Sequence, residues 1–214
     1  MVTVRLFVEG GGDSNALRTA CREGFAAFLK KAGLGRTMPR IVASGSRRSA
    51  YDDFCTAVAN GQPALLLVDS EAPVAQQHQQ GNEKAHWSPW AHLAQRQGDG
   101  WSKPDGADDK DCHFMVQCME SWFLADRETL QAFFDPGFKP NALPAESRPI
   151  EGIDKDALYQ ALKTATADCK TKAEYGKGEP SFKLLARIDP KKVTAASGWA
   201  ERFVAQVKAR MGAT

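Results

Sequence analysis

Acidic residues directly follow two of the apolar runs that we expect to be strands. Glu9 ends the alternating run 2–8, and Asp69 and Glu71 end the continuous run 64–68. Carboxylate oxygens are ligands that Mg²⁺ and Mn²⁺ prefer, and side chains two residues apart in an extended segment point the same way. The spacing predicts that Asp69 and Glu71 bind one divalent cation, with Glu9 completing the site or moving a proton. Taken singly, such residues are more often turn residues or helix caps.

A glycine-rich loop follows the first acidic position. Gly10 and Gly11 let backbone amides approach a phosphate closely, and Asp13 is either an extra ligand or a helix cap. The loop is not a Walker A or GxGxxG motif, because the lysine or the helix-spaced glycines are missing. A flexible turn is the alternative interpretation.

Basic residues in two further segments could contact phosphate. Ser46, Arg47 and Arg48 follow the apolar run 39–43, and two arginines beside a hydroxyl group suit phosphate binding. Lys177 belongs to a later basic run that also carries a tyrosine. An ordinary solvated helix start, or a charged loop, is the alternative for each segment.

The composition excludes several classes of protein. The 214 residues are 43% hydrophobic and 25% charged, with a formal net charge of +2, so a nucleic-acid site would have to come from local basic clusters. The five cysteines form no CxxC pair, which argues against a disulfide framework and a zinc site. No apolar stretch approaches the roughly 20 residues that cross a bilayer, and no signal peptide is evident. We therefore expect a cytoplasmic protein with no membrane partner.

Apolar runs alternate with segments of helical periodicity. This pattern predicts an α/β fold with a mostly parallel, four-stranded sheet flanked by helices. In such sheets, ligands bind at the carboxyl ends of the strands. The expected strands are 2–8, 39–43, 64–68 and 112–117, and the expected helices are 14–29, 48–60, 89–97, 119–134, 154–168, 181–187 and 197–211.

Two changes in composition divide the chain. Segment 74–110 is rich in Gln, Gly, Asp and Trp, and we expect it to be an insertion or active-site flap within a catalytic domain of residues 1–135. A Pro- and Ala-rich loop then leads into residues 136–214, which we expect to form a helical extension packed on the same domain.

The ordered set of acidic motifs resembles the Toprim domain, which is shared by topoisomerases, bacterial primases and the OLD and RloB-type nucleases. Val8-Glu9-Gly10 resembles its first motif, Leu67–Glu71 its second, and Met119–Leu124 an acidic-aromatic motif after the fourth strand. The resemblance covers roughly residues 1–130 and is greatest to small bacterial Toprim-like families of unknown function that are often encoded beside AAA-type ATPases in defence loci. Glu71 departs from the pattern, because many members have Asp there.

The resemblance implies a Rossmannoid, Toprim-like sheet and a role for each matching residue. Glu9 would be the general acid/base or first metal ligand, and Asp69 and Glu71 would bind Mg²⁺ or Mn²⁺. Glu120 could serve a second metal, or could stabilise the N-terminus of a helix instead. Lys177 could neutralise charge in the transition state.

The expected function is that of a metal-dependent Toprim nuclease that cleaves phosphodiester bonds in DNA or RNA. By resemblance, it would be the effector of an anti-phage defence system, with an AAA-type ATPase encoded nearby and with a possible homodimer. One alternative is a non-catalytic Toprim scaffold that binds an ATPase or nucleic acid. Another is a phosphotransfer or phosphohydrolase enzyme that acts on a small phosphoester.

Overall fold

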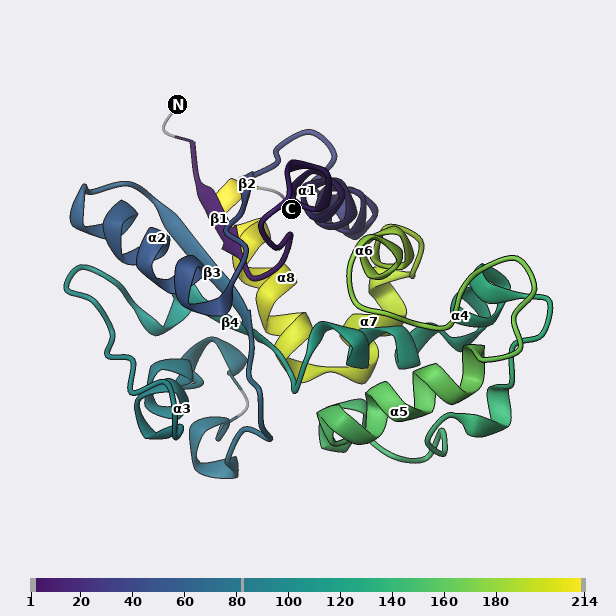
Figure 1. Cartoon of the computed structure of the whole chain (residues 1–214). Helices are drawn as coiled ribbons and strands as arrows, with labels where there is room; N and C mark the ends of the chain where they lie inside the picture. Colours follow the sequence, from purple (N-terminus) through teal and green to yellow (C-terminus); the bar gives the residue numbers. More distant parts are fainter. Residues whose placement is uncertain (1–2, 82, 213–214) are drawn as a thin grey trace.

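The computed structural model describes residues 3–81 and 83–212 and is built around a parallel sheet. Its strands are β1 (Arg5–Val8), β2 (Arg40–Ala43), β3 (Ala64–Asp69) and β4 (Cys112–Met115). Within the described residues the sheet has four strands in the order β2-β1-β3-β4, and every pair is parallel (Figure 1). The α/β class and the four-stranded parallel sheet predicted from the sequence are confirmed. The part of the first expected strand at Val2 lies outside the described residues.

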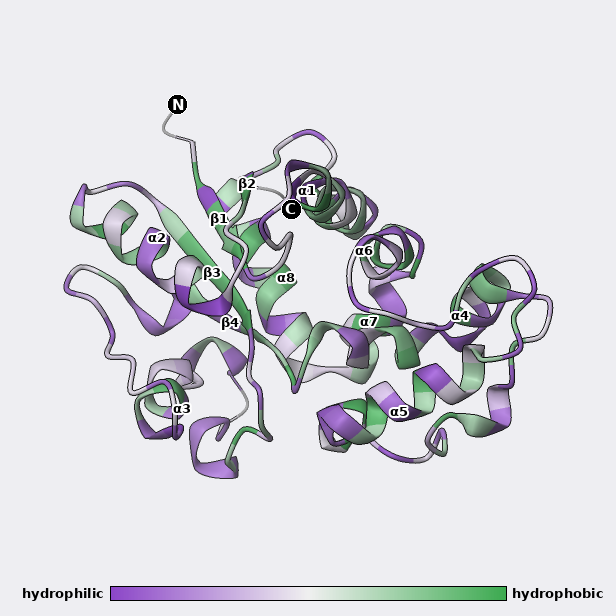
Figure 2. Ribbon diagram, viewed as in Figure 1, coloured by the Kyte–Doolittle hydropathy of each residue, from purple (hydrophilic) through white to green (hydrophobic). Residues whose placement is uncertain are grey.

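Alternate side chains of the central strands enter two separate cores, as the two-residue period of a strand requires. Leu65 and Leu67 of β3 join one core, whereas Leu66 and Val68 join the other, and the whole of β3 is buried. The strands of the sheet are accordingly among the most hydrophobic parts of the ribbon (Figure 2).

Helices α1 (Asn15–Leu29) and α2 (Arg47–Ala59) pack against opposite faces of the sheet, because their apolar residues belong to the two different cores. The hydroxyl of Ser14 accepts a hydrogen bond from the Leu17 amide over 3.1 Å, which caps α1. The hydroxyl of Ser46 accepts one from the Ser49 amide over 3.0 Å and caps α2 in the same way.

Segment 74–110 is largely irregular and packs on the α2 side of the sheet. It contains α3 (Pro89–Gln95) and short 3₁₀ turns at Gln76–His78, Lys84–His86 and Asp109–Asp111. Its tryptophans are buried in the second core and hold the segment on the sheet: Trp87, Trp90 and Trp101.

The region after β4 differs from expectation in one place. Instead of one helix over 119–134, a 3₁₀ helix covers Met119–Asp126 and α4 covers Arg127–Phe134. The Met119 amide donates a hydrogen bond to the Asp69 carboxylate over 2.9 Å, which ties the start of this segment to the sheet edge. The tighter winding is therefore associated with a tertiary contact that helical periodicity does not reveal.

The remaining helices contribute to the core that contains Leu65 and Leu67. They are α5 (Lys155–Thr166), α6 (Glu179–Leu185), α7 (Pro190–Ala196) and α8 (Gly198–Met211), with short 3₁₀ turns at Pro140–Ala142 and Ile150–Gly152. Helix α7 was not expected from the sequence, although Asp189 as a cap and Pro190 at the first helical position are a recognised start signal. None of the helices in the described residues has the length and apolarity needed to span a membrane.

Helix α8 connects the sheet to segment 74–110. It packs along β4, and its Arg202 is only 1% exposed. The Arg202 guanidinium donates hydrogen bonds to the carbonyl of Cys112 over 2.8 Å, to that of Lys84 over 2.7 Å and to that of Asp109 over 2.6 Å. The C-terminal helix therefore helps to fix segment 74–110 against the sheet.

Candidate metal centre

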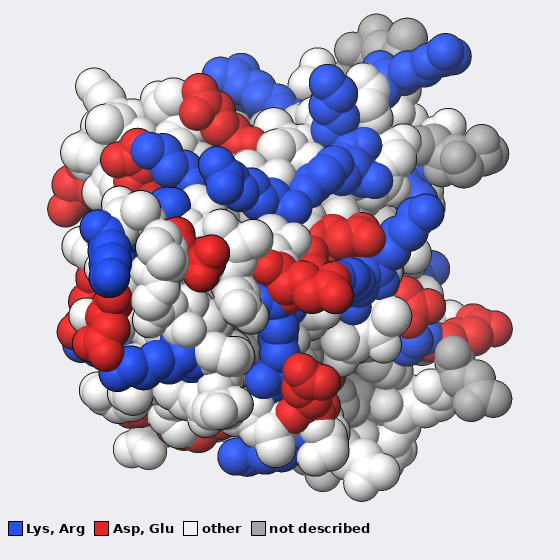
Figure 3. Space-filling view, turned by 90° about the vertical axis from the view of Figure 1, so that its right-hand side faces the viewer, with Lys and Arg blue, Asp and Glu red and all other residues white. Residues whose placement is uncertain are grey.

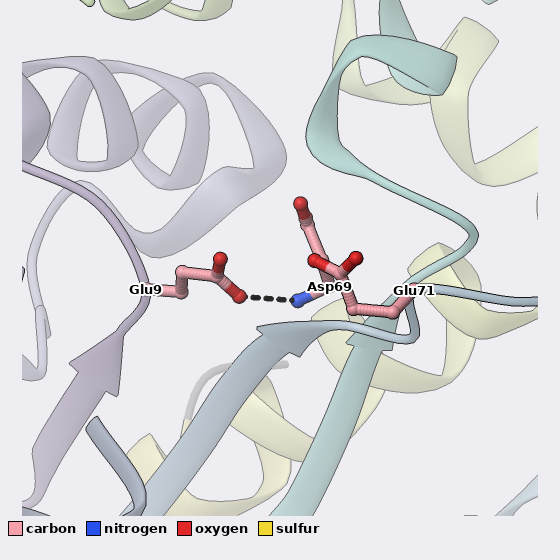
Figure 4. A group of neighbouring side chains, drawn as sticks. All are labelled: Glu9, Asp69 and Glu71. Carbon is pink, nitrogen blue, oxygen red and sulfur yellow. Dashed lines mark hydrogen bonds between the residues drawn. The ribbon is translucent and has the colours of Figure 1, made fainter. Parts of the chain in front are cut away.

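Three carboxylates meet at the carboxyl edge of the sheet. Glu9 follows β1, Asp69 is the last residue of β3, and Glu71 lies two residues further on (Figure 4). Each can offer one oxygen such that the three oxygens lie within 4.8 Å of one another. A divalent cation needs oxygens from several side chains around one point, and this group provides them.

The backbone at this edge sets the positions of these side chains. The Glu9 amide donates to the Leu67 carbonyl over 3.1 Å, and the Glu9 carboxylate accepts a hydrogen bond from the Asp69 amide over 3.1 Å. The Glu71 amide donates to the Gln117 carbonyl over 2.9 Å, while Glu71 has a φ of 63°. Positive φ is costly for a residue with a Cβ atom, and such conformations cluster at functional sites.

Burial and mutual repulsion disfavour ionisation of two of these carboxylates, Asp69 and Glu9. Asp69 is 6% exposed, and burial, followed by the charges of Glu9 and Glu120, raises its pKa well above the ordinary value. Burial also raises the pKa of Glu9, although the Asp69 amide and the Arg47 charge act in the opposite direction. A cation between these groups would relieve both costs.

Arg47 and Lys155 lie against the carboxylates. The Arg47 Nε atom donates to the Asp69 carbonyl over 2.9 Å and lies 3.9 Å from the Glu9 carboxylate. The Lys155 ammonium pairs with Glu71 and lies 3.6 Å from Asp69. Burial lowers the pKa of Lys155, but Asp69 and Glu71 outweigh that effect and raise it.

Segment 74–110 contributes two further charged residues, Arg96 and Asp99, to the ion pairs around the carboxylates. Asp99, whose side chain is 5% exposed, pairs with Arg47 and with Arg96, the latter over 3.0 Å. Arg96 also lies 4.0 Å from Glu71. The segment therefore borders the candidate metal centre, and Asp99 neutralises part of the positive charge of Arg47.

A cavity of about 300 Å³ opens over the carboxylates. Glu9, Asp69 and Glu120 line it together with the glycine loop, Lys177 and Phe182. The Gly10 amide donates to the Gly45 carbonyl over 2.9 Å and is already engaged, so an anion would have to use other amides of the loop. Gly11 has a φ of 91°, and a Cβ atom there would lie 2.9 Å from the Arg18 backbone, so the loop requires glycine.

Glu120 lines this cavity but does not belong to the group of three. Its carboxylate, 3% exposed, accepts hydrogen bonds from the Tyr175 hydroxyl over 2.8 Å and from the Tyr159 hydroxyl over 3.1 Å. The Tyr175 hydroxyl also lies 2.8 Å from the Ser181 hydroxyl. The two tyrosines hold the Glu120 carboxylate, and burial followed by the Glu120 charge raises the pKa of Tyr175 above its ordinary value.

Of the other residues expected to bind phosphate, only some lie at the candidate metal centre. Arg47 lies in it, and Lys177 is exposed at its wall. Ser46 is engaged in capping α2, and Arg48 is paired with the exposed Asp52 over 2.9 Å. Asp13 is exposed just before α1.

Several polar residues of the centre were not found by sequence reasoning: Arg96, Asp99, Lys155 and Tyr159. They lie on helices or loops far from the acidic motifs in the chain. Lys155 directly follows Asp154, which caps α5 by accepting hydrogen bonds from the Asp156 and Ala157 amides. That cap was a readable signal for the helix start, but it did not indicate which strand edge the helix would approach.

Comparison with known proteins gives one match. A family model described as a domain of unknown function (DUF4276) matches residues 8–208, which is most of the chain. No curated protein and no solved structure matches the sequence or the fold.

Proposed function

The chain belongs to the DUF4276 family, and we propose that it is a metal-dependent phosphodiester hydrolase that acts on nucleic acid. The observation that supports this proposal best is the convergence of Glu9, Asp69 and Glu71 within 4.8 Å at the carboxyl edge of a parallel sheet. That edge is where open α/β folds bind ligands. The donor set is all oxygen, which suits Mg²⁺ or Mn²⁺ and does not suit a soft metal.

The charge of the centre also fits a divalent cation. Five carboxylates lie in it or line it, namely Glu9, Asp69, Glu71, Asp99 and Glu120, and four cations accompany them, namely Arg47, Arg96, Lys155 and Lys177. Burial is the largest cause of the raised pKa values of Glu9 and Asp69, and the neighbouring carboxylates raise them further. A bound divalent cation would activate a water molecule and polarise a phosphoryl oxygen.

The protein side chains have separate roles in this proposal. Asp69 and Glu71 hold the cation. Glu9 is either its third ligand or the group that transfers a proton to the leaving oxygen. Lys177, which is exposed at the cavity wall, contacts a phosphate oxygen and neutralises developing charge.

The sequence resemblance to Toprim nucleases supports nucleic acid as the substrate. It covers the motifs at Glu9, Asp69 and Glu71 and the acidic-aromatic segment that contains Glu120. On the same ground we propose that the protein works with an AAA-type ATPase encoded nearby in anti-phage defence. A second cation at Glu120 is also part of this resemblance, and it would use the lone pairs that the hydrogen bonds from Tyr159 and Tyr175 leave on the two carboxylate oxygens.

Metal titration tests the proposal directly. We expect the wild-type protein to bind Mn²⁺ in isothermal titration calorimetry, and Asp69→Asn to lose this binding. Asp105→Asn is the matched control, since Asp105 is an exposed aspartate outside the centre. Equal Mn²⁺ binding by all three proteins, or none by the wild type, would contradict a metal centre here.

Cleavage is measured separately, because a partner ATPase can hold such an enzyme inactive. Supercoiled plasmid, single-stranded DNA and tRNA are incubated with wild-type protein and Mg²⁺ or Mn²⁺, with and without the candidate ATPase. We expect products with at least one substrate and none with Asp69→Asn. Metal binding without any cleavage under all these conditions would favour a non-catalytic scaffold.

A small phosphoester is the second candidate substrate, and the cavity size favours it. About 300 Å³ is at the lower end of the range for small-molecule sites, and Leu17, Met115, Met119 and Phe182 give the cavity an apolar part. Hydrolysis of a chromogenic phosphomonoester or phosphodiester that Asp69→Asn abolishes, with no cleavage of any polynucleotide, would support this alternative.

A further inference from the structure

A second cavity, of about 600 Å³, adjoins the candidate metal centre along helix α5. One wall is a face of α5, with Asp156, Tyr159, Gln160 and Lys163, and the other is the loop 175–177. Lys177 lines both this cavity and the cavity over the carboxylates, so the two are neighbours on either side of that residue. We call this second cavity the α5 groove.

The groove leads away from the carboxylates. Helix α5 begins at Lys155, whose ammonium lies 3.6 Å from Asp69, so its N-terminal end lies at the metal centre. The groove residues of α5 have the spacing i, i+3, i+4 and i+7, which places them on one face of the helix. With a rise of 1.5 Å per residue, this face extends about 10 Å from Asp156 to Lys163.

The side chains of the groove combine positive charge with an aromatic ring. Lys163 and Lys177 are exposed, and in residues 3–81 and 83–212 neither has a carboxylate within ion-pair distance. The Tyr159 ring is half-buried, and the Lys177 ammonium lies 4.4 Å from its centroid. Asp156 is the acidic residue among the groove residues.

Some lysine residues elsewhere on the C-terminal helices and loops are paired with carboxylates, whereas within the described residues Lys170, Lys172, Lys191 and Lys208 have no ion pair, like those of the groove. Lys139 is paired with Asp168 over 2.6 Å, and Lys183 with Glu179 over 2.8 Å. Figure 3 shows a band of Lys and Arg side chains across the upper part of this side of the molecule, above the height at which α5 lies in Figure 1. Lys163 and Lys177 are therefore available to contact an anionic ligand beside the site.

We propose that the α5 groove binds single-stranded nucleic acid, namely the nucleotides that flank the phosphodiester group in the carboxylate cavity. This inference rests on the proposed function, and it specifies the substrate class. Proteins that bind single strands combine a positively charged groove with aromatic side chains on which unpaired bases stack. A base would stack on the Tyr159 ring in place of the Lys177 ammonium, which would move to a phosphate, and Lys163 would contact a second phosphate. A small phosphoester would occupy the first cavity and leave the groove empty.

Fluorescence anisotropy with labelled ten-nucleotide DNA and RNA tests the groove. EDTA is present, so that no metal-dependent cleavage occurs, and a duplex of the same sequence and a poly-glutamate peptide serve as competing probes. We expect the single strands to bind more tightly than the duplex, and the peptide not to displace them. Equal binding of duplex and single strand, or displacement by the peptide, would overturn the proposal.

Two tyrosine variants separate the ring from the hydroxyl. Tyr159→Phe and Tyr159→Leu both remove the hydrogen bond to Glu120, but only Tyr159→Leu removes the aromatic ring. We expect Tyr159→Leu to bind the single strand at least about fivefold more weakly than Tyr159→Phe, which is the effect of losing one stacked base. Equal affinities of the two variants would overturn stacking at this residue. Circular dichroism and thermal unfolding check that both variants are folded.

The salt dependence of single-strand affinity, measured in the same assay, tests the phosphate contact of Lys163. Loss of one phosphate contact with a single strand should reduce the slope of log affinity against log salt by about 0.7. We expect this reduction for Lys163→Gln and not for Lys183→Gln, which removes an equal charge from α6 outside the groove. Identical slopes for both variants would overturn the proposed contact.

Failure of the groove proposal can be distinguished from failure of the proposed metal-dependent function. If Mn²⁺ binds at Asp69 but the groove variants bind single strands like the wild type, the groove proposal fails and the proposed function stands. If the groove variants weaken binding but the wild type takes up no Mn²⁺, the groove stands as a binding site and the hydrolase proposal fails.

Discussion

The Glu9 carboxylate accepts a hydrogen bond from the backbone amide of Asp69 over 3.1 Å, which joins the ends of β1 and β3 through a side chain of the candidate metal centre (Figure 4). One Glu9 oxygen thus has a structural partner, and the carboxylate also faces Arg47 at 3.9 Å. A substitution at Glu9 can therefore remove the negative charge and keep an oxygen that accepts the hydrogen bond from Asp69.

Glu9→Gln should weaken metal binding and leave the fold intact. Glutamine keeps an oxygen that can accept the Asp69 hydrogen bond, but it lacks the negative charge. We expect Mn²⁺ affinity in calorimetry to fall at least about tenfold, or ~1.4 kcal/mol. The free energy of unfolding should change by less than about 1 kcal/mol. Glu23→Gln, an exposed position of α1, is the control and should match the wild type in both measurements.

The positive φ of 63° at Glu71 predicts an unusual order of stabilities. Glu71→Gly and Glu71→Ala both remove the ion pairs with Lys155 and Arg96, so they differ in the backbone preference of the new residue. We expect the glycine variant to be more stable by about 1 kcal/mol in urea unfolding, because alanine pays for the left-handed conformation.

The same pair of substitutions at Glu23, inside α1, is the control for this comparison. There the order should reverse, with glycine less stable than alanine by about 0.5–1 kcal/mol. A glycine variant of Glu71 that is no more stable than the alanine variant would show that the left-handed conformation is not retained in solution.

Asp126 should stabilise the fold in a pH-dependent way. Its carboxylate, 3% exposed, accepts hydrogen bonds from the Asp189 amide over 2.9 Å and from Lys192 over 2.8 Å. Burial raises the pKa of Asp126, but these hydrogen bonds outweigh it and hold the pKa below its ordinary value. The Asp126 carboxylate therefore adds its full contribution to the free energy of unfolding above the unfolded-state pKa of about 3.9. This contribution is lost as pH falls through the lower folded-state pKa.

We expect Asp126→Ala to cost about 1–3 kcal/mol of unfolding free energy at pH 7, because the Asp189 amide loses its partner. Urea unfolding from pH 7 down to about pH 2.5 should show the two proteins approaching each other in stability below about pH 3.9. Glu128→Ala, which removes the exposed partner of Lys192, should cost less than about 1 kcal/mol. A pH-independent difference for Asp126→Ala would contradict this account.

Arg202 should be among the most sensitive positions for stability. Its buried guanidinium satisfies carbonyls from β4 and segment 74–110, among them those of Cys112, Lys84 and Asp109. We expect Arg202→Met to lower the unfolding free energy by about 3 kcal/mol or more, and Arg202→Lys to restore little, because an ammonium lacks the planar set of donors. Arg210→Met, at a more exposed position on the same helix, should cost less than half as much in the same measurement.

The acidic edge was predictable because two local signals coincide there. Continuous apolar residues identify β3 as a buried strand, and Asp69 directly follows them in the sequence. Parallel strands bring the residues after their carboxyl ends to one edge, so Glu9 and Asp69 could be expected to meet before the structure was known. Strand pairing then added the order β2-β1-β3-β4 and the register, neither of which the hydrophobic pattern specifies.

The partners of the carboxylates were not predictable in the same way. Lys155 is one of many lysines on amphipathic helices, and nothing local distinguishes it from Lys163 on the same helix. Its contact with Glu71 bridges 84 positions in the sequence, and that of Tyr175 with Glu120 bridges 55. Such contacts depend on how α5 and the loop before α6 pack on the sheet.

By itself, the sequence determined the α/β class, most of the helices and the three carboxylates at the sheet edge, because periodicity and strand ends are local properties of the chain. Tertiary structure alone decided that Lys155 pairs with Glu71 and Asp99 with Arg47, that two tyrosines hold Glu120, and that the α5 groove adjoins the site. The physical reason is that side chains on separate elements meet only once the two cores have packed, and packing depends on the shapes of all the elements together.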